Sequence, residues 1–218
     1  MDIVTTVIVI SVAYMIGSFP TAYIVGRWRG VNIFEYGSGN MGTTNAIRTL
    51  GLGWGLLVLA GDLGKGILAV LIAREIAPAE PLSTQASASV IAALVVVMGH
   101  NWSVIASIIA GSIKGGKGAA TAGGTLLIIM PTVAIAIPLF ILALIIITTR
   151  YMSLAVMTSA VVAAFIVAGM VALGELEPIY LIYCTLAGLI IYRHRENIRR
   201  LLAGNERRLG ERVHISQK

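Results

Sequence analysis

The stretch AATAGGTLLIIMPTVAIAIPLFILALIIITT, residues 119–149, decides how often this chain crosses a membrane. It carries no charged side chain, and two prolines interrupt its apolar run. A membrane-spanning helix takes about 20 apolar residues. The stretch can therefore form one long crossing or two short helices of about 12 and 18 residues, and hydropathy alone leaves both open.

The composition around this stretch is that of an integral membrane protein. Of the 218 residues, 57% are hydrophobic and 12% are charged, and the mean hydropathy is +0.90, whereas soluble domains carry about 25% charged residues. A net charge of +6 would suggest nucleic acid as the partner of a soluble chain. Here the basic residues stand at the ends of apolar segments, which indicates membrane orientation instead. We expect an all-α, polytopic membrane protein without a nucleic-acid partner.

Five further apolar segments are interpreted as crossings: residues 3–26, 52–73, 86–110, 152–173 and 178–192. No basic residue precedes the first of them, so we expect a retained helix, kinked at Pro20, and not a cleaved signal. The single cysteine, Cys184, lies in the last, so an internal disulfide is excluded. The basic tail, residues 193–218, is expected to begin as a continuation of the last helix.

Charge selects two crossings for residues 119–149. With the basic tail in the cytoplasm, two crossings leave Arg74 as the one basic residue of the outer loops. The acidic Asp2, Glu75, Glu80, Glu175 and Glu177 then face outward, while Arg27, Arg29, Arg48, Lys114, Lys117 and Arg150 are cytoplasmic. A single crossing would put Arg48 and Lys117 outside. We predict a single membrane domain, residues 1–218, with seven transmembrane helices, the N-terminus out and the C-terminus in. Three polar motifs, residues 37–48, 99–121 and 194–206, then share the cytoplasmic face.

The first motif, GSGNMGTTNAIR at residues 37–48, has the composition of an anion site. Its three glycines allow positive φ angles and a close approach of the backbone to a ligand. Neutral hydrogen-bond partners stand between them, and Arg48 adds a planar, forked cation. Such a set suits a phosphate or a carboxylate; the alternative is a polar turn between helices. The candidate residues are Ser38, Asn40, Thr43, Asn45 and Arg48.

The second motif, GSIKGGKG at residues 111–118, differs at one position from the phosphate-binding pattern G-x-x-x-x-G-K-[ST]. Gly118 replaces the hydroxyl residue that would bind Mg²⁺, so nucleotide hydrolysis is disfavoured. The backbone amides can still form an anion nest; the alternative is a glycine-rich hinge. The predicted phosphate loop contains Lys114, Gly115, Gly116, Lys117 and Gly118, with Thr121 in the helix that follows.

Other polar residues stand inside or beside apolar segments, where they are costly. His100 and Asn101 are candidate site residues, with a bond to a neighbouring helix as the alternative. Asp62 and Lys65 are three residues apart and can form a supporting ion pair. Ser153 either caps its helix or joins the site, and His194 and Asn197 share one helix face.

The sequences GSGNMGTTNAIR, GHNW followed by KGGKGAAT, and HRENIRRLLAGNE resemble the three motifs of the bacterial acyl-phosphate:glycerol-3-phosphate acyltransferase family, the PlsY family. The resemblance implies a seven-span enzyme of the bacterial inner membrane whose active site faces the cytoplasm. It would transfer a fatty acyl group from acyl phosphate to the 1-hydroxyl of sn-glycerol 3-phosphate and produce lysophosphatidic acid, the first step of phospholipid synthesis. By position, the substrate-binding or catalytic residues would be Ser38, Asn45, Arg48, Lys117, Ser153, His194 and Asn197, with Gly115, Gly116 and Gly118 in the phosphate loop and Glu206 in support. Trp102-Ser103 and Ala119 depart from the family pattern, beside the polar atoms of the second motif.

The chemistry expected from the residues agrees with this outline. The chain has no Gly-x-Ser-x-Gly nucleophile motif, and an acyl phosphate is already activated. We expect direct attack by the glycerol hydroxyl, with the substrate phosphate as base, without metal or other cofactor. That coenzyme A does not carry the acyl group is implied by the family resemblance. Two alternatives remain: a secondary transporter of a small anion, whose site would lie near the membrane midplane, and a scaffold subunit of a membrane complex.

Overall fold

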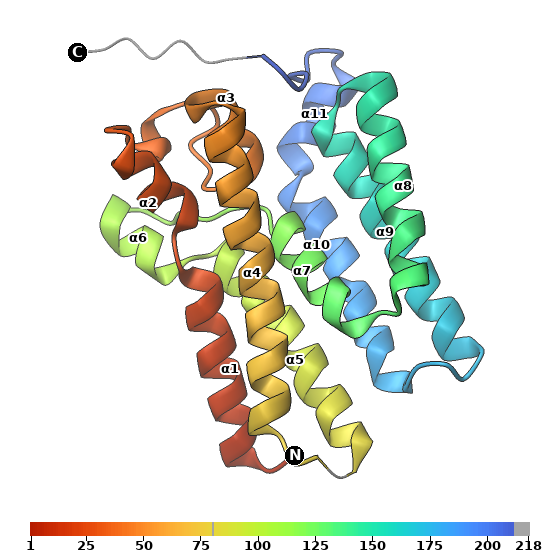
Figure 1. The fold of residues 1–218 in the computed structure, drawn as a ribbon. Coiled ribbons are helices and arrows are strands. Elements are labelled where there is room, and N and C mark those ends of the chain that lie inside the picture. Colours follow the sequence, from red (N-terminus) through yellow and green to blue (C-terminus); the bar gives the residue numbers. More distant parts are fainter. Residues whose placement is uncertain (80, 212–218) are drawn as a thin grey trace.

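The computed structural model describes residues 1–79 and 81–211, and every regular element in them is helical (Figure 1). The one β-type contact within these two ranges is an isolated bridge between Ser103 and Lys114. The elements are α1 (Ile3–Ser18), α2 (Thr21–Trp28), η1 (Ile33–Glu35), α3 (Thr43–Leu50), α4 (Leu52–Ile76), α5 (Leu82–Asn101), α6 (Val104–Ala110), α7 (Ala119–Ile129), α8 (Thr132–Thr149), α9 (Met152–Ala172), η2 (Pro178–Cys184), α10 (Thr185–Arg193) and α11 (Arg195–Leu202).

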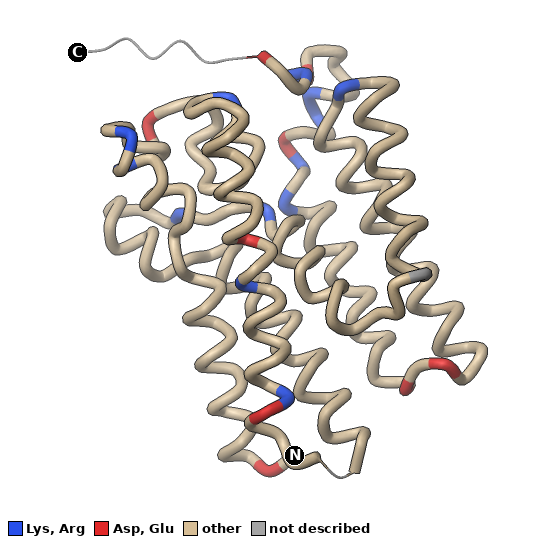
Figure 2. Tube along the Cα trace, viewed as in Figure 1, with Lys and Arg blue, Asp and Glu red and all other residues tan. Residues whose placement is uncertain are grey.

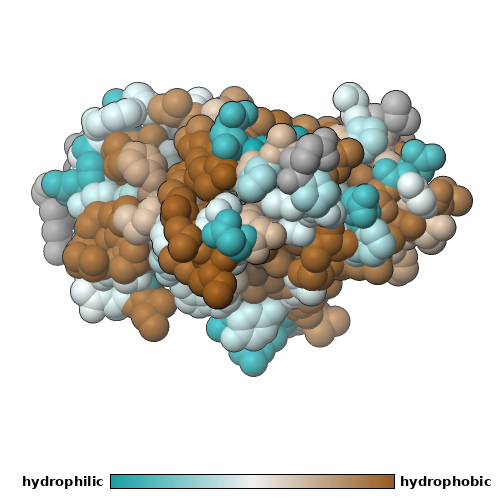
Figure 3. Space-filling view, turned by 90° about the horizontal axis from the view of Figure 1, so that it is seen from below, coloured by the Kyte–Doolittle hydropathy of each residue, from teal (hydrophilic) through white to brown (hydrophobic). Residues whose placement is uncertain are grey.

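Within residues 1–79 and 81–211, four segments are long and apolar enough to cross a membrane: Ile3–Trp28, Leu52–Ile76, Leu82–Asn101 and Met152–Ala172. Three shorter apolar helices accompany them, Ala119–Ile129, Ala134–Thr149 and Pro178–Arg193. Large apolar side chains point outward from these helices: Ile147 is 78% exposed and Phe165 is 74% exposed. Figure 3 shows broad hydrophobic areas between hydrophilic ones at the end that contains the N-terminus. The exposed apolar surface suits contact with lipid, and it confirms the prediction of an all-α membrane protein.

Glycines bring the central helices close together. A Cβ atom at Gly17 of α1 would overlap the carbonyl oxygen of Val96 in α5, and one at Gly124 of α7 would overlap that of Leu63 in α4. Small residues at such crossings let two backbones touch, which is how helices pack without a hydrophobic driving force between them. The α4–α7 contact is important for the site because it fixes the helix that follows the glycine loop.

The segment 119–149 forms two helices, α7 and α8, separated at Met130 and Pro131. Pro131 is the N-cap of α8, where a missing N–H costs nothing. After the turn, α8 packs along α9. The interpretation of this stretch as two helices, and not one, is confirmed.

The predicted crossing 86–110 is present as a helix of membrane-spanning length, but its predicted bounds are wrong. Helix α5 begins at Leu82 and ends at Asn101, and α6 turns away as a separate helix. Ser103 causes the break, because its side chain caps α6 at Ala106 N and its own N–H donates to Lys114 O. Hydropathy averaged over a long window does not detect such a turn, since the segments on both sides, 86–98 and 104–110, are mostly apolar.

Two other helices also divide where the sequence predicted continuity or only a kink. The first apolar segment is interrupted between Ser18 and Thr21, beside Pro20, so α2 starts anew. The tail does not continue α10, because the backbone turns at His194 before α11 begins.

Charged residues separate by sign between the two ends of the molecule. Basic residues dominate the end formed by α2, α3 and α11, while acidic residues dominate the opposite end (Figure 2). The acidic end carries Asp2 at the start of α1, Arg74 and Glu75 at the end of α4, and Glu175 and Glu177 between α9 and η2. Glu80, which was predicted to face the same way, lies outside the described residues.

Candidate active site

A cavity of about 1040 Å³ lies between the α3–α4 side and the α8–α11 side of the molecule, with part of α7 in its wall. Its lining changes from polar to apolar along its length. The predicted site residues that line it are Ser38, Asn40, Thr43, Asn45, Arg48, Asp62, His100, Lys117, Gly118, Ser153, His194, Asn197 and Glu206. The rest of the wall is mostly aliphatic, with leucines from α4, α7 and α8 and alanines from α9.

Asn45 shapes the first motif from within. Its amide nitrogen donates to the carbonyls of Ile33, Tyr36 and Asn40, at 3.3, 3.2 and 3.0 Å, and its oxygen accepts from Ser38 N at 2.9 Å. Gly37 has φ +65°, and a Cβ atom there would overlap Asn45 Oδ1. The Asn45 side chain is therefore fully engaged by the loop backbone, and it leaves the other groups of the loop to face the cavity.

Arg48 is buried, with 9% of its surface exposed, and lies on the cavity wall. Its Nη2 donates to the carbonyl of Arg207 at 3.2 Å, while its Nε has no partner within residues 1–79 and 81–211. Burial lowers the pKa of the guanidinium, which nevertheless stays charged at neutral pH. An unused donor on a buried cation is well suited to an anion.

The glycine loop at residues 115–118 rests on the end of α5. Gly116 N donates to His100 O at 2.9 Å, and Gly116 O accepts two bonds from Arg193, at 3.2 and 2.8 Å. A Cβ atom at Gly116 would overlap His100 Nε2, and Gly118 has φ +79° at the N-cap of α7. A side chain is thus excluded at Gly116 for a steric reason and disfavoured at Gly118 for a conformational one.

Lys117 belongs to a network of polar side chains at the polar end of the cavity, which we call its head. Its Nζ donates to Asn197 Oδ1, and Asn197 Nδ2 donates to Glu206 Oε1 at 2.6 Å. Ser153 Oγ donates to the same Glu206 oxygen at 2.8 Å, and Arg200 Nε donates to Oε2 at 2.7 Å. Ser153 therefore belongs to the site and does not cap α9. The network joins the glycine loop, α9, α11 and the C-terminal segment.

The network sets the charges of its members. Burial lowers the pKa of Lys117 to about 8. Burial opposes the charge of Glu206, but hydrogen bonds from Asn197, Arg200 and Ser153 outweigh it and hold the pKa of the carboxyl below its usual value. At neutral pH the head of the cavity therefore combines a carboxylate with an excess of cations.

His194 is neutral and has a fixed orientation. Its Nδ1 lies 2.8 Å from the carbonyl oxygen of Ile190, which can only accept, so Nδ1 carries the proton. Burial, followed by the charge of Lys117, lowers the pKa of His194 to about 4. The remaining nitrogen, Nε2, is left as an acceptor in a residue that lines the cavity.

Asp62, Lys65 and His100 form a buried group below the glycine loop. Lys65 Nζ donates to Asp62 Oδ1 at 2.7 Å, and His100 Nδ1 lies 3.7 Å from the same oxygen. Asp62 Oδ2, both amide atoms of Asn101 and the Thr121 hydroxyl have no partner among the described residues. Unpaired buried polar atoms in one place are usual where a ligand or water binds.

The structure separates some predicted residues from the cavity. Lys114 points away from it and lies over the Phe34 ring, with Nζ 5.7 Å from the ring centre. Lys65, Asn101, Gly115, Gly116 and Thr121 lie beneath the lining and not on it. Conversely, the cavity wall includes Arg193, Arg200 and Arg207, which the sequence analysis treated as orientation signals. The available signals were that Arg193 directly follows the last apolar segment and that Arg200 lies within the third motif.

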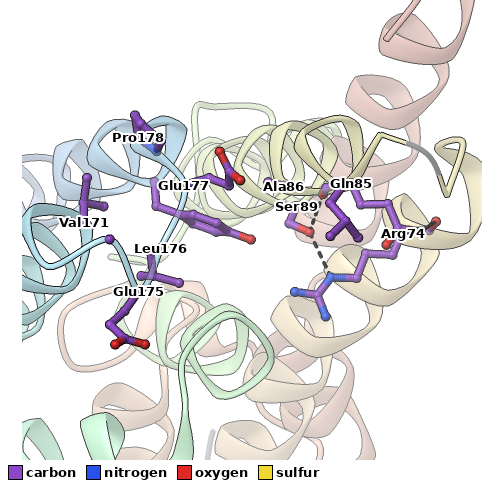
Figure 4. A pocket seen from close by; sticks show the side chains of 12 residues that line it. Arg74, Gln85, Ala86, Ser89, Val171, Glu175, Leu176, Glu177 and Pro178 are labelled. Carbon is purple, nitrogen blue, oxygen red and sulfur yellow. Dashed lines mark hydrogen bonds between the residues drawn. The ribbon is translucent and has the colours of Figure 1, made fainter.

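A second cavity of about 480 Å³ lies at the acidic end (Figure 4). Arg74 points into it and donates to Ser89 Oγ at 2.9 Å and to Ile128 O at 3.4 Å. These bonds tie α4 to α5 and α7, so Arg74 has a bracing role there. In the described part of the chain, no three His, Cys, Asp or Glu residues come together as metal ligands.

Comparison with known proteins assigns the family. The family model "Glycerol-3-phosphate acyltransferase" matches residues 7–204. The chain belongs to this family, the PlsY family. Among similar members, glycerol-3-phosphate acyltransferase 2 of Moorella thermoacetica is 42% identical over 202 residues, which are 92% of this chain and 96% of the relative. A glycerol-3-phosphate acyltransferase of Thermus thermophilus is 44% identical over 206 residues, 92% and 94% of the two chains.

Two crystal structures of a PlsY acyltransferase share the fold. One is the glycerol 3-phosphate form, with a TM-score of 0.79, and the other is the lysophosphatidic acid form, with a TM-score of 0.78. Each is 32% identical to this chain and covers 94% of it, with 96% of its own chain matched. The PlsY resemblance of the three motifs is therefore confirmed over nearly the whole length.

Proposed function

We propose that this protein transfers a fatty acyl group from acyl phosphate to the 1-hydroxyl of sn-glycerol 3-phosphate and releases lysophosphatidic acid and phosphate. One observation carries the proposal: a single cavity has a cationic end and an aliphatic end. Both substrates carry phosphate, and one of them carries an aliphatic chain. Arg48, Lys117, Arg193 and Arg200 at one end suit the phosphates, and the leucine- and alanine-lined part suits the chain.

The proposed reaction is a direct displacement. The glycerol hydroxyl oxygen attacks the acyl carbon, the bond from that carbon to the phosphate oxygen breaks, and the hydroxyl proton passes to the departing phosphate. Lys117, Arg48 and the amides of the glycine loop would stabilise the negative charge of that phosphate. His194 Nε2 would accept a hydrogen bond from the attacking hydroxyl, and Glu206 would keep Ser153 and Asn197 oriented; the hydrogen bonds of His194 Nδ1 and of Glu206 support these roles.

We also propose that the chain is one membrane domain of seven crossings in the bacterial cytoplasmic membrane, with its N-terminus out and its site facing the cytoplasm. The three short apolar helices would be tilted crossings or would lie where the bilayer thins. Support comes from the separation of charge in Figure 2, because cytoplasmic loops carry the excess of Lys and Arg.

The test is an assay with purified protein in detergent. Labelled glycerol 3-phosphate and palmitoyl phosphate should produce labelled lysophosphatidic acid without any vesicle, and Lys117→Met should lose this activity.

In the same assay, product formation should continue in excess EDTA, and acyl-CoA should not replace acyl phosphate as the donor. Loss in EDTA that Mg²⁺ reverses would refute the metal-free reaction, and equal turnover with acyl-CoA would refute the donor. Uptake into sealed vesicles without an acylated product would instead indicate a transporter.

A further inference from the structure

The apolar part of the cavity has a limited depth. This depth can be read from the residues of α9 that line the cavity. Seven residues of α9 line the cavity: Met152, Ser153, Val156, Ser159, Ala160, Ala163 and Ala164. Most of them recur at intervals of three or four residues, so they occupy one face of the helix. Ser153 lies in the polar network at the head, and Ala164 is the last lining residue of this helix. At 1.5 Å per residue the row is about 16 Å long.

Helix α8 gives the same depth independently. It runs antiparallel to α9 and packs against it, and its lining residues are Ile135, Pro138, Leu139, Leu142 and Ile146. Ile146 lies near the α8–α9 corner, next to the head of the cavity, and Ile135 lies in the first turn of the helix. The distance between these two is again about 16 Å along the axis. The lining residues of α8 and α9 therefore end at the same depth, about 16 Å from the polar end of the cavity.

Large, fixed side chains lie at that level. Tyr183 is 6% exposed, and its hydroxyl lies 2.8 Å from Thr125 Oγ1 and donates to Ala122 O at 3.1 Å, which ties η2 to α7. Cys184 Sγ donates to Ala164 O at 3.4 Å, which ties η2 to α9. Ile135, also 6% exposed, lines the apolar end of the cavity on the α8 side. By contrast, α9 contributes only methyl groups there, from Ala163 and Ala164.

We propose that this end of the cavity sets the length of the acyl chain that the enzyme accepts, with Tyr183 and Ile135 as the floor and Ala163 and Ala164 as the width-determining residues. The inference rests on the proposed function, because it assumes that an acyl chain occupies the apolar part. It adds a specificity that depends on residues outside the three motifs. Closely packed walls give way little, so a side chain added at Ala164 occupies the volume of the terminal carbons.

The experiment compares acyl phosphates of graded chain length on purified variants. Ala164→Leu should lower kcat/KM for the longest donors about ten-fold or more relative to the shortest, and Tyr183→Leu should shift the optimum toward longer donors. Tyr183→Phe keeps the ring and should keep the profile. Phe165→Leu is the matched control, since Phe165 is the next residue of α9 and points away from the cavity into the surroundings.

The outcomes separate the two proposals. A length profile of Ala164→Leu that matches wild type would overturn the inference. Equal loss at all chain lengths, in a variant whose thermal unfolding is unchanged, would overturn it too, because Ala164 would then act on the chemistry and not on length. Absence of acyl transfer by the wild-type enzyme with every donor would refute the proposed function, and the inference with it.

Discussion

Arg48 is a buried cation whose Nη2 donates to a carbonyl and whose Nε has no partner among the residues that the structure describes. If both donors turn to a substrate phosphate, the planar fork is required and charge alone is insufficient. We therefore predict that Arg48→Lys loses kcat/KM nearly as severely as Arg48→Ala, by about 10²-fold. Steady-state kinetics in detergent would measure this, with thermal unfolding as the control for folding. A lysine variant close to wild type would reduce Arg48 to a simple charge.

Lys117 titrates near the working pH. Its pKa is lowered to about 8 by burial, so its charge is present below that pH and is lost as the pH rises through it. An anion binds the charged form better, so the KM for acyl phosphate, whose phosphate Lys117 holds in the proposed reaction, should increase from about pH 7 to about pH 9.

Lys117→Arg provides the comparison, because arginine stays charged throughout this range. Its KM should vary less with pH, even if its kcat is lower. A wild-type KM that does not change over the same interval would contradict a contact between Lys117 and substrate phosphate.

At the scale of the helices, the buried Asp62–Lys65 ion pair of α4 can stabilise the glycine loop at residues 115–118 or only the packing of the helices. Substitutions of the two residues distinguish these roles. Breaking one partner of such a pair costs about 3–5 kcal/mol, whereas replacing both with apolar residues is often neutral. Asp62→Leu alone should therefore unfold at lower temperature, and the double variant Asp62→Leu/Lys65→Met should regain stability.

The double variant should still show a raised KM, because it removes the Asp62 carboxylate that lies 3.7 Å from His100 Nδ1. His100 supports the glycine loop, since its carbonyl accepts a hydrogen bond from Gly116 N and its ring packs against Gly116. Circular dichroism melts and KM values for both substrates would measure the two effects. If the double variant recovers stability and KM together, the pair serves the bundle alone.

The elements also show which features a sequence can predict. Apolar length and charge sign predicted the separation of α7 from α8, since both signals act over many residues. The break at Trp102 and Ser103 depends on one hydroxyl cap and one bridge to Lys114. The orientation of Lys114, toward Phe34, and the inward position of Arg193 depend on tertiary packing. Spacing along the chain predicted the motif residues, but it carries no information about which side of a loop faces the cavity.

At the scale of the whole molecule, the opposed charges of the two ends predict a fixed orientation. In a Cys184→Ser background, single cysteines at Glu177 and Glu211, both exposed, should react with a membrane-impermeant thiol reagent from opposite sides. Glu177→Cys should label in intact cells, and Glu211→Cys only after the membrane is opened. Labelling of both in intact cells would refute the seven-crossing arrangement.

Glu206 binds Ser153, Asn197 and Arg200, and it follows all three of them in the chain. During synthesis these partners therefore emerge from the ribosome before the carboxylate that holds them together. A nascent chain has no finished reaction centre until the helices from α1 to α11 have been made and the segment after α11 has folded back. Partly made protein would hold its substrates poorly, so the membrane gains the activity in one step and not helix by helix.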